Sequence, residues 1–295
     1  MDQPSNRKVL LVPAEAGHVI MERYGLSCEV KSWSAPGIEE YADRIVSAHA
    51  PYEMRVKNTT CRINIASPIE KFRQYCLGVI EGFIRAGRPI APRCRLIVLH
   101  PPPRFWNEQA GQACPIQAVG EYGLMIESLK RLSKLCAENN LLLVLENNRV
   151  RWNGVGDDEA FDRERYFGKL CECFASSAQE WAQVPADVDE PNFGLCFDTS
   201  HAVTYAHRLP EAARKGVVDL YVTLSGNRLW HVHWSDSILE GNKGRQDLHL
   251  TVGKGTIPRD LHSKIWNYPS ATTYLFEHWT HEGDLAFETR YVERL

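Results

Sequence analysis

The sequence lacks the features that mark membrane-spanning, exported and disulfide-rich proteins. None of its apolar runs approaches the roughly 18 residues that a membrane-spanning helix needs. The N-terminal segment MDQPSNRKVLLVPAEAG contains only a short apolar stretch and does not have the layout of a signal peptide. The nine cysteines are scattered and form no Cys-x-x-Cys pair, which is typical of reduced thiols. We therefore expect a cytoplasmic protein with no membrane partner.

An excess of charge of one sign is also missing. The chain carries 34 lysines and arginines against 37 aspartates and glutamates, a formal net charge of -3. This balance argues against a globally basic nucleic-acid-binding protein. Hydrophobic residues make up 44% and charged residues 24%, which excludes a disordered or fibrous chain. Because no linker or shift in composition divides the sequence, we expect residues 1–295 to form a single domain.

The sequence does contain a regular alternation of short apolar segments with amphipathic ones. Several of the apolar segments, such as LIVLH, are continuous runs typical of parallel strands buried on both faces. The expected strands are 9–13, 27–32, 44–49, 95–100, 141–146, 193–198, 229–233 and 272–277. The expected helices are 67–87, 121–138, 158–183, 209–224 and 257–267. Strands that alternate with helices in this way predict the α/β class and a single (β/α)8 TIM barrel.

The expected strands repeatedly end in, or are followed by, a histidine or a carboxylate. These residues are His49, His100, Glu146, Asp198, His201, His233, Asp247, His249 and Glu277. Active sites of such barrels lie at the C-terminal ends of the strands, so all nine side chains are expected at one mouth. A lone histidine at a strand end is usually structural, but nine such residues in register predict a metal site.

Imidazole and carboxylate groups are ligands for zinc, manganese, cobalt and magnesium. Because one ion takes about four protein ligands, this set allows one divalent ion or a cluster of up to three. His231 lies two residues before His233, and we expect its side chain to point to the other face of the strand and to be structural.

Cations are frequent in the loops that are expected at this mouth. Among them, Arg104, Arg149 and Arg245 are candidate substrate-binding residues. Such a group in a net acidic protein favours an anionic substrate, for example a sugar phosphate, a carboxylate or a nucleic-acid backbone. The alternative, that these are simply solvated loop charges, stays open.

These motifs resemble those of the xylose-isomerase-like TIM-barrel superfamily, which joins sugar and sugar-phosphate isomerases and epimerases with the apurinic endonuclease IV family. The resemblance covers residues 25–280 and is strongest in the segments GLCFDTSH and GRQDLHLTVGKG. It implies that the isomerase ion would be held by Glu146, Asp198, His233 and Glu277. The endonuclease IV cluster would add His49, His100, His201, Asp247 and His249. Tyr52, three residues after His49, also fits that family and is a further candidate substrate-binding residue.

Three segments depart from the endonuclease pattern. The first strand reads VLLVPAEAG, Pro102-Pro103-Arg104 replaces a Gly-Ser-His run, and Asn148-Arg149-Val150 replaces Thr-Ala-Gly. Because the corresponding segments of that family help to build its DNA groove, nucleic acid is less favoured as a partner than a small sugar or anionic substrate.

Two reactions fit this set of residues. The sequence favours an isomerase or epimerase that acts on a sugar or sugar phosphate through a metal-stabilised enediolate, with Glu146 and Glu277 as the catalytic acid and base. The alternative is an endonuclease IV-like phosphodiester hydrolase with a two- or three-zinc cluster. A metal-holding barrel without turnover is a third interpretation. Related barrels often pair through their outer helices, so a homo-oligomer also stays open.

Overall fold

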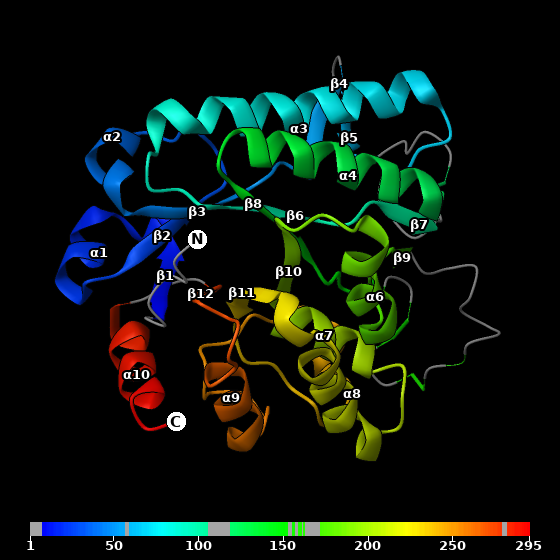
Figure 1. Ribbon diagram of the computed structural model, residues 1–295. Coiled ribbons are helices and arrows are strands. Elements are labelled where there is room, and N and C mark those ends of the chain that lie inside the picture. The colour runs from blue at the N-terminus through cyan, green and yellow to red at the C-terminus, as the bar shows by residue number, and fades with distance from the viewer. Residues whose placement is uncertain are drawn as a thin grey trace.

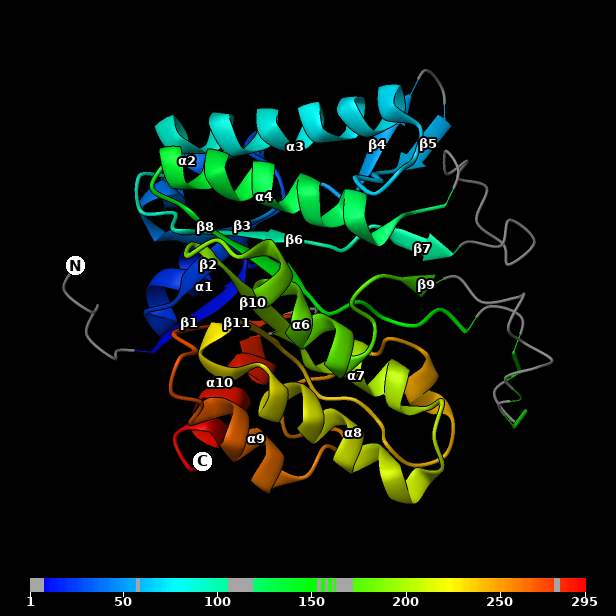
Figure 2. The same cartoon turned by 45° about the vertical axis from the view of Figure 1, so that its right-hand side comes forward.

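A closed barrel of eight parallel strands lies at the centre of the molecule (Figures 1 and 2), and this confirms the predicted TIM-barrel fold. The computed structural model describes residues 8–56, 59–105, 119–152, 155–156, 159–160, 162, 172–278 and 282–295. Around the barrel the strand order is β1-β12-β11-β10-β8-β6-β3-β2. The strands are β1 (Val9–Pro13), β2 (Ser27–Val30), β3 (Ile45–His49), β6 (Leu96–Leu99), β8 (Leu142–Glu146), β10 (Phe193–Asp198), β11 (Leu229–Trp234) and β12 (Thr273–Phe276).

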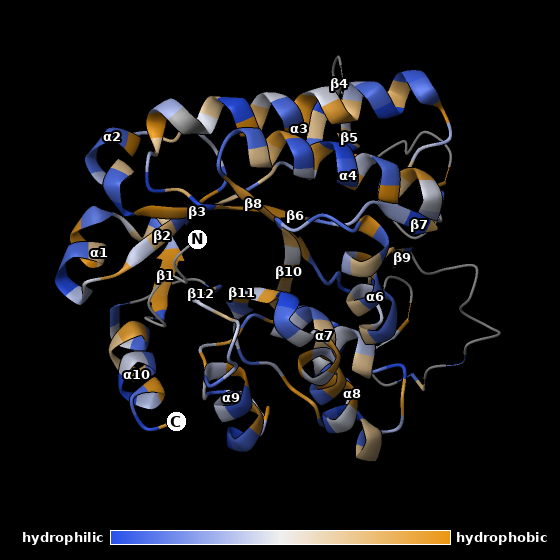
Figure 3. Ribbon diagram, viewed as in Figure 1, coloured by the Kyte–Doolittle hydropathy of each residue, from blue (hydrophilic) through white to orange (hydrophobic). Residues whose placement is uncertain are grey.

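Helices surround the barrel, and α3 and α4 lie side by side on one flank in both views. The α-helices are α1 (His18–Tyr24), α2 (Ile38–Tyr41), α3 (Glu70–Ile90), α4 (Tyr122–Glu138), α6 (Ala178–Val188), α7 (Thr199–Ala206), α8 (Glu211–Leu224), α9 (Arg259–Trp266) and α10 (Glu282–Val292). In Figure 3, hydrophobic colour dominates strands such as β1 and β3, whereas α3 and α4 alternate between hydrophobic and hydrophilic residues. This is the pattern of helices that bury one face and expose the other. No helix in the described residues is both long and apolar enough to cross a membrane.

The predicted helix over 158–183 is wrong over residues 172–177, whereas residues 178–183 are helical as predicted. Residues Glu172–Cys173 form the short strand β9, and α6 begins only at Ala178. Ala175 has a φ of 57°, which a right-handed helix cannot contain. The hydroxyl of Ser177 then accepts a hydrogen bond from the backbone N–H of Glu180 and starts the helix as its N-cap. Residues 163–171 of this prediction lie outside the described residues.

Within the described residues, two antiparallel strand pairs lie outside the barrel. Strands β4 (Glu53–Val56) and β5 (Thr59–Arg62) form one pair, and β7 (Pro103–Phe105) joins β9 in the other. Figure 2 places both pairs at the same end of the barrel. They follow β3 and β6 in the chain, so this end is the one at which the barrel strands terminate.

The interior of the barrel changes from apolar to polar along the strands. Leu96, Val98, Val144 and Cys196 form a small cluster separate from the main core, which packs between strands and helices. Side chains two residues apart on a strand share a face, so the next inward positions on β8 and β10 are Glu146 and Asp198. The alternation that fills the barrel with apolar side chains therefore also directs these carboxylates inward at its mouth.

Candidate metal centre

The structure brings all nine predicted ligands together at the C-terminal end of the barrel. His49, Glu146 and Asp198 are the last residues of their strands. The others are His100 after β6, His233 in β11, Glu277 after β12, His201 in α7, and Asp247 and His249 after the short helix η5 (Lys243–Arg245). Their convergence agrees with the expectation from the sequence, whereas their role as ligands stays a prediction.

Glu146 lies at the centre of these side chains and is fully buried. Its Oε2 atom lies 3.3 Å from Nε2 of His49 and 2.9 Å from Nε2 of His100. Its Oε1 atom lies 3.0 Å from Nδ1 of His201 and 3.5 Å from Nδ1 of His233. Each oxygen of this carboxylate therefore faces a different pair of histidines.

The side chains fall into three overlapping groups that have the composition of ion sites. The groups are His49, His100 and Glu146; Glu146, Asp198, His233 and Glu277; and Asp198, His201 and His249. Within each group, one candidate ligand atom from every residue lies within 4.8 Å of the others. Glu146 belongs to two of the groups and Asp198 also belongs to two, so carboxylates link all three.

Local backbone structure fixes the direction of Asp198. Its Oδ1 atom accepts a 2.7 Å hydrogen bond from the N–H of His201 and caps helix α7, while Oδ2 is buried without a hydrogen bond. The side chain of Asn147 holds the same residue through two contacts, from Nδ2 to the Asp198 carbonyl (2.9 Å) and from the Asp198 N–H to Oδ1 (2.6 Å). Asp198 is thus clamped with one oxygen directed into the site. The sequence analysis did not identify Asn147.

Three of the histidines share an orientation that suits metal ligands. Nδ1 lies against a backbone carbonyl oxygen at 2.9 Å in His49 (Ala50), at 2.9 Å in His201 (Asn147) and at 2.8 Å in His249 (Glu277). A carbonyl can only accept, so Nδ1 is the donor in each ring and Nε2 is the nitrogen that would bind an ion. Donation from one ring nitrogen is the usual way in which proteins orient a histidine ligand.

Asp247 and His249 close the site from the loop after β11. Oδ1 of Asp247 lies 3.1 Å from Nε2 of His249, and its Oδ2 lies 3.6 Å from Nε2 of His201. The loop is held by two backbone hydrogen bonds between Asp236 and Leu250, of 2.7 and 2.8 Å. His249 itself has a φ of 43°, an uncommon conformation for a residue other than glycine.

The electrostatics of the site fit a bound cation. Burial alone would raise the pKa of Glu146, but His100 and His233 hold it well below its ordinary value. Burial raises the pKa of Asp198 to about 7, against the opposing effect of His201. A buried carboxylate oxygen without a partner is costly. Four carboxylate oxygens here make no hydrogen bond and face histidine nitrogens instead, at 3.0, 3.6, 3.1 and 2.7 Å: Oε1 of Glu146, Oδ2 of Asp198, Oδ1 of Asp247 and Oε2 of Glu277. Coordination of divalent ions would satisfy them.

The four predicted substrate-binding residues have different surroundings. The half-exposed ring of Tyr52 stacks on His100 with 5.1 Å between ring centroids, and Nη1 of Arg149 lies 2.6 Å from Oδ2 of Asp247. Arg104 instead pairs with Glu180 and Glu172. Arg245 is buried and donates to the carbonyl oxygens of Gly156 (2.9 Å) and Glu159 (2.6 Å). Contacts with candidate ligands thus support Tyr52 and Arg149, and the other two assignments stay predictions without such support.

The prediction that His231 faces away from His233 is wrong. Both side chains contact Glu29 of β2, inside the barrel, and their ring centroids are 5.0 Å apart. The reason is the strand period of two, which places residues i and i+2 on the same face. Glu29 was not identified from the sequence. The available signal was a carboxylate within a strand that is otherwise expected to be buried.

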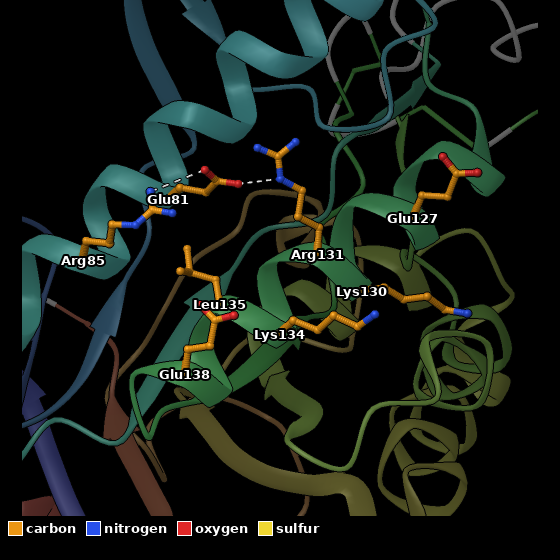
Figure 4. A pocket seen from close by; sticks show the side chains of 8 residues that line it. All are labelled: Glu81, Arg85, Glu127, Lys130, Arg131, Lys134, Leu135 and Glu138. Atoms are coloured by element: carbon orange, nitrogen blue, oxygen red, sulfur yellow. Dashed lines mark hydrogen bonds and ion pairs between the residues drawn. The ribbon is translucent and has the colours of Figure 1, made fainter.

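A charged groove lies on the outside of the barrel, between α3 and α4 (Figure 4). It has a volume of about 540 Å³ and is lined by Glu81, Arg85, Glu127, Lys130, Arg131, Lys134, Leu135 and Glu138. Nε of Arg131 lies 2.6 Å from Oε1 of Glu81 across it. The groove is made by the helices and contains none of the nine candidate ligands.

Comparisons with known proteins agree with this architecture. The family described as "Xylose isomerase-like TIM barrel" matches residues 28–289. A D-tagatose 3-epimerase-like protein has a similar structure, with a TM-score of 0.64, 16% identity and 97% of each chain covered. Endonuclease IV from Thermus thermophilus gives 0.60 and 16%, covering 98% of this chain and 100% of that one. The 3-keto-D-glucoside 4-epimerase YcjR from E. coli gives 0.59 and 15%, covering 96% and 99%. No curated protein sequence matches the chain.

Proposed function

Because this chain belongs to the xylose isomerase-like TIM-barrel family, we propose that it is a divalent-metal-dependent enzyme and that it hydrolyses a phosphoester. The observation that carries the proposal is the overlap of three ligand groups on Glu146 and Asp198. A one-ion centre would use about four protein ligands and leave the remaining five side chains without a common role. For this reason we rank hydrolysis above the isomerisation or epimerisation that the sequence favoured.

Phosphoester hydrolysis would give a role to the candidate ligands and to two residues beside them. Ions held by these groups would supply Lewis acidity, which activates water and offsets the negative charge that develops on a phosphoryl group. Glu146 presents one oxygen to His49 and His100 and the other to His201 and His233. Tyr52 and Arg149 lie at the accessible side of the centre, where a guanidinium and a phenol suit a phosphate and its adjoining group.

The first test is the ion content of the protein, purified without chelators or metal-affinity resin. We expect about three zinc ions per chain, since each ligand group would hold one. The same preparation should hydrolyse bis-p-nitrophenyl phosphate or DNA that contains abasic sites, and chelation should stop the reaction. Binding of a single ion, or the absence of hydrolysis by the fully loaded protein on these and simpler phosphoesters, would contradict the proposal.

Isomerisation or epimerisation of a sugar or sugar phosphate is the second candidate. One group, Glu146, Asp198, His233 and Glu277, is sufficient for a single ion, and it contains the two carboxylates that this reaction needs. Nδ1 of His233 lies 2.7 Å from Oε2 of Glu277 and 3.5 Å from Oε1 of Glu146, so both carboxylates lie close to the same ring nitrogen. One could remove the proton next to the substrate carbonyl and the other return it, through an enediolate of the substrate. Four of the similar structures carry epimerase names.

The variant His249→Ala distinguishes the two reactions. His249 belongs to the third ligand group and is absent from the group that suits one ion. For hydrolysis we expect one ion to be lost and kcat to fall by about 10²-fold or more, as when one group that stabilises transition-state charge is removed. For isomerisation the ion content should stay the same and activity should fall only slightly.

A control for the loss of a buried imidazole is His207→Ala. His207 is also buried, but its Nε2 lies 2.9 Å from the carbonyl oxygen of Ile238, away from the ligand groups. This variant should keep the ion content of the parent protein. Equal ion content in His249→Ala and the parent protein would argue against the three-ion site.

A further inference from the structure

His233 is held differently from the other oriented histidines of the centre. In His49, His201 and His249 a backbone carbonyl accepts from Nδ1, and Nε2 remains for an ion. In His233 no carbonyl oxygen accepts from Nδ1, and this atom faces the carboxylates of Glu277 and Glu146. Its Nε2 therefore needs an acceptor deeper in the barrel.

Glu29 stands where that acceptor is needed. Its Oε1 atom lies 3.3 Å from Nε2 of His233, and its Oε2 atom lies 3.1 Å from Nε2 of His231. The hydroxyl of Ser47 donates to the same Oε2 at 2.7 Å. Glu29 is only 2% exposed, so its carboxylate has no access to bulk water and depends on these neighbours.

We propose that Glu29 is a positioning residue of the metal centre: it accepts the Nε2–H of His233 and thereby keeps Nδ1 free and directed at the ion held with Glu146, Asp198 and Glu277. The carboxylate takes the place that carbonyl oxygens have for the other three histidines. A carboxylate behind a histidine ligand also increases the basicity of the ring, which strengthens its bond to a metal. This inference rests on the proposed metal-dependent function.

A different use of the same residues is an ion bound deeper in the barrel. Cys196, His231 and His233 are close enough to form a ligand group. However, His231 has both ring nitrogens engaged, with Nδ1 2.7 Å from Oγ1 of Thr273 and Nε2 3.1 Å from Glu29. These contacts favour a hydrogen-bonded network over an ion at this depth.

The test measures zinc affinity by competition with a chromophoric chelator, using the metal alone as the probe. Glu29→Met removes the acceptor at nearly constant length, and we expect one ion to bind about 10- to 100-fold more weakly. Glu29→Gln keeps an oxygen acceptor without the charge and should fall between that variant and the parent protein. Cys28→Ser is the control, since it adds a buried hydroxyl on the neighbouring residue, whose side chain points to the opposite face of β2.

Imidazole ¹⁵N–¹H spectra of the parent protein give a second readout that does not depend on the variants folding. The His233 proton should be found on Nε2 in the zinc-loaded protein, whereas a proton on Nδ1 would overturn the proposal. Unchanged zinc affinity in folded Glu29→Met would also overturn it.

Two further outcomes separate this proposal from its alternatives. If Cys196→Ser and Glu29→Met each remove one ion and leave the affinity of the others unchanged, Glu29 is a ligand of a deeper site and the positioning role is wrong. A parent protein that binds no zinc would instead refute the proposed function itself.

Discussion

Replacing Glu146 with glutamine should abolish turnover and ion binding together. Both oxygens of this buried carboxylate face candidate ligands, and the residue belongs to two ligand groups. The amide has no charge to balance the cations, and one of its two positions becomes an N–H donor that repels them. Removal of a single stabilising donor costs about 10²–10³-fold in other enzymes, so we expect a loss of about 10³-fold or more here. The measurement is kcat together with the ion content.

The matched control for Glu146→Gln is Glu180→Gln. Glu180 is a partly buried carboxylate of α6 that pairs with Arg104 and lies outside the three groups. Its replacement should leave the number of bound ions unchanged. If Glu146→Gln bound the full complement of ions and retained activity, the centre of the site would be assigned to the wrong residue.

Glu277→Gln should be nearly as severe under either proposed reaction. Oε2 of Glu277 lies 2.7 Å from Nδ1 of His233, and Oε1 lies 3.9 Å from Nζ of Lys31. For hydrolysis the change removes an anionic ligand, and for isomerisation it also removes one of the two groups that exchange a proton with the substrate. General acid–base groups contribute about 10²–10⁴-fold, so kcat should fall within or beyond that range.

A comparison of kcat with KM makes the prediction for Glu277→Gln more specific. Because Glu277 acts in the transition state in both reactions, kcat should fall far more than KM changes. Glu282→Gln, an exposed carboxylate at the start of α10, is the control and should behave like the parent protein. Near-normal turnover by Glu277→Gln would contradict the site assignment for both reactions.

The barrel could be predicted from the sequence because its strands are continuous apolar runs that are easy to recognise. Parallel strands covered on both sides, such as β6 and β10, consist of continuous buried residues, which distinguishes them from the amphipathic helices between them. The convergence of the candidate ligands was predictable for the same reason, since residues such as Glu146 and Asp198 interrupt apolar runs at the strand ends. Barrel geometry then places all such ends together.

Glu29 was missed because its partners are distant in the sequence. His231 is 202 residues away, and only the closure of the barrel brings β2 opposite β11. The clamp by Asn147 is likewise a contact between strands that meet only in the folded chain. Loops follow weaker rules, so the sequence could not indicate that Arg104 contacts Glu180 or that Arg245 donates to the carbonyl oxygen of Gly156.

The pairing of the first barrel strand with the last has a consequence for how the protein is made. β1 is held by β12 through the register of Val9 with Thr273, and Glu277 follows directly after that last strand. The chain is synthesised from its N-terminus, so most of the candidate ligands are made before β12. The barrel, however, cannot close until β12 has been synthesised. The candidate centre is thus complete only after β12 and Glu277 have been synthesised, so a polypeptide that stops before residue 273 has an open sheet edge and lacks Glu277.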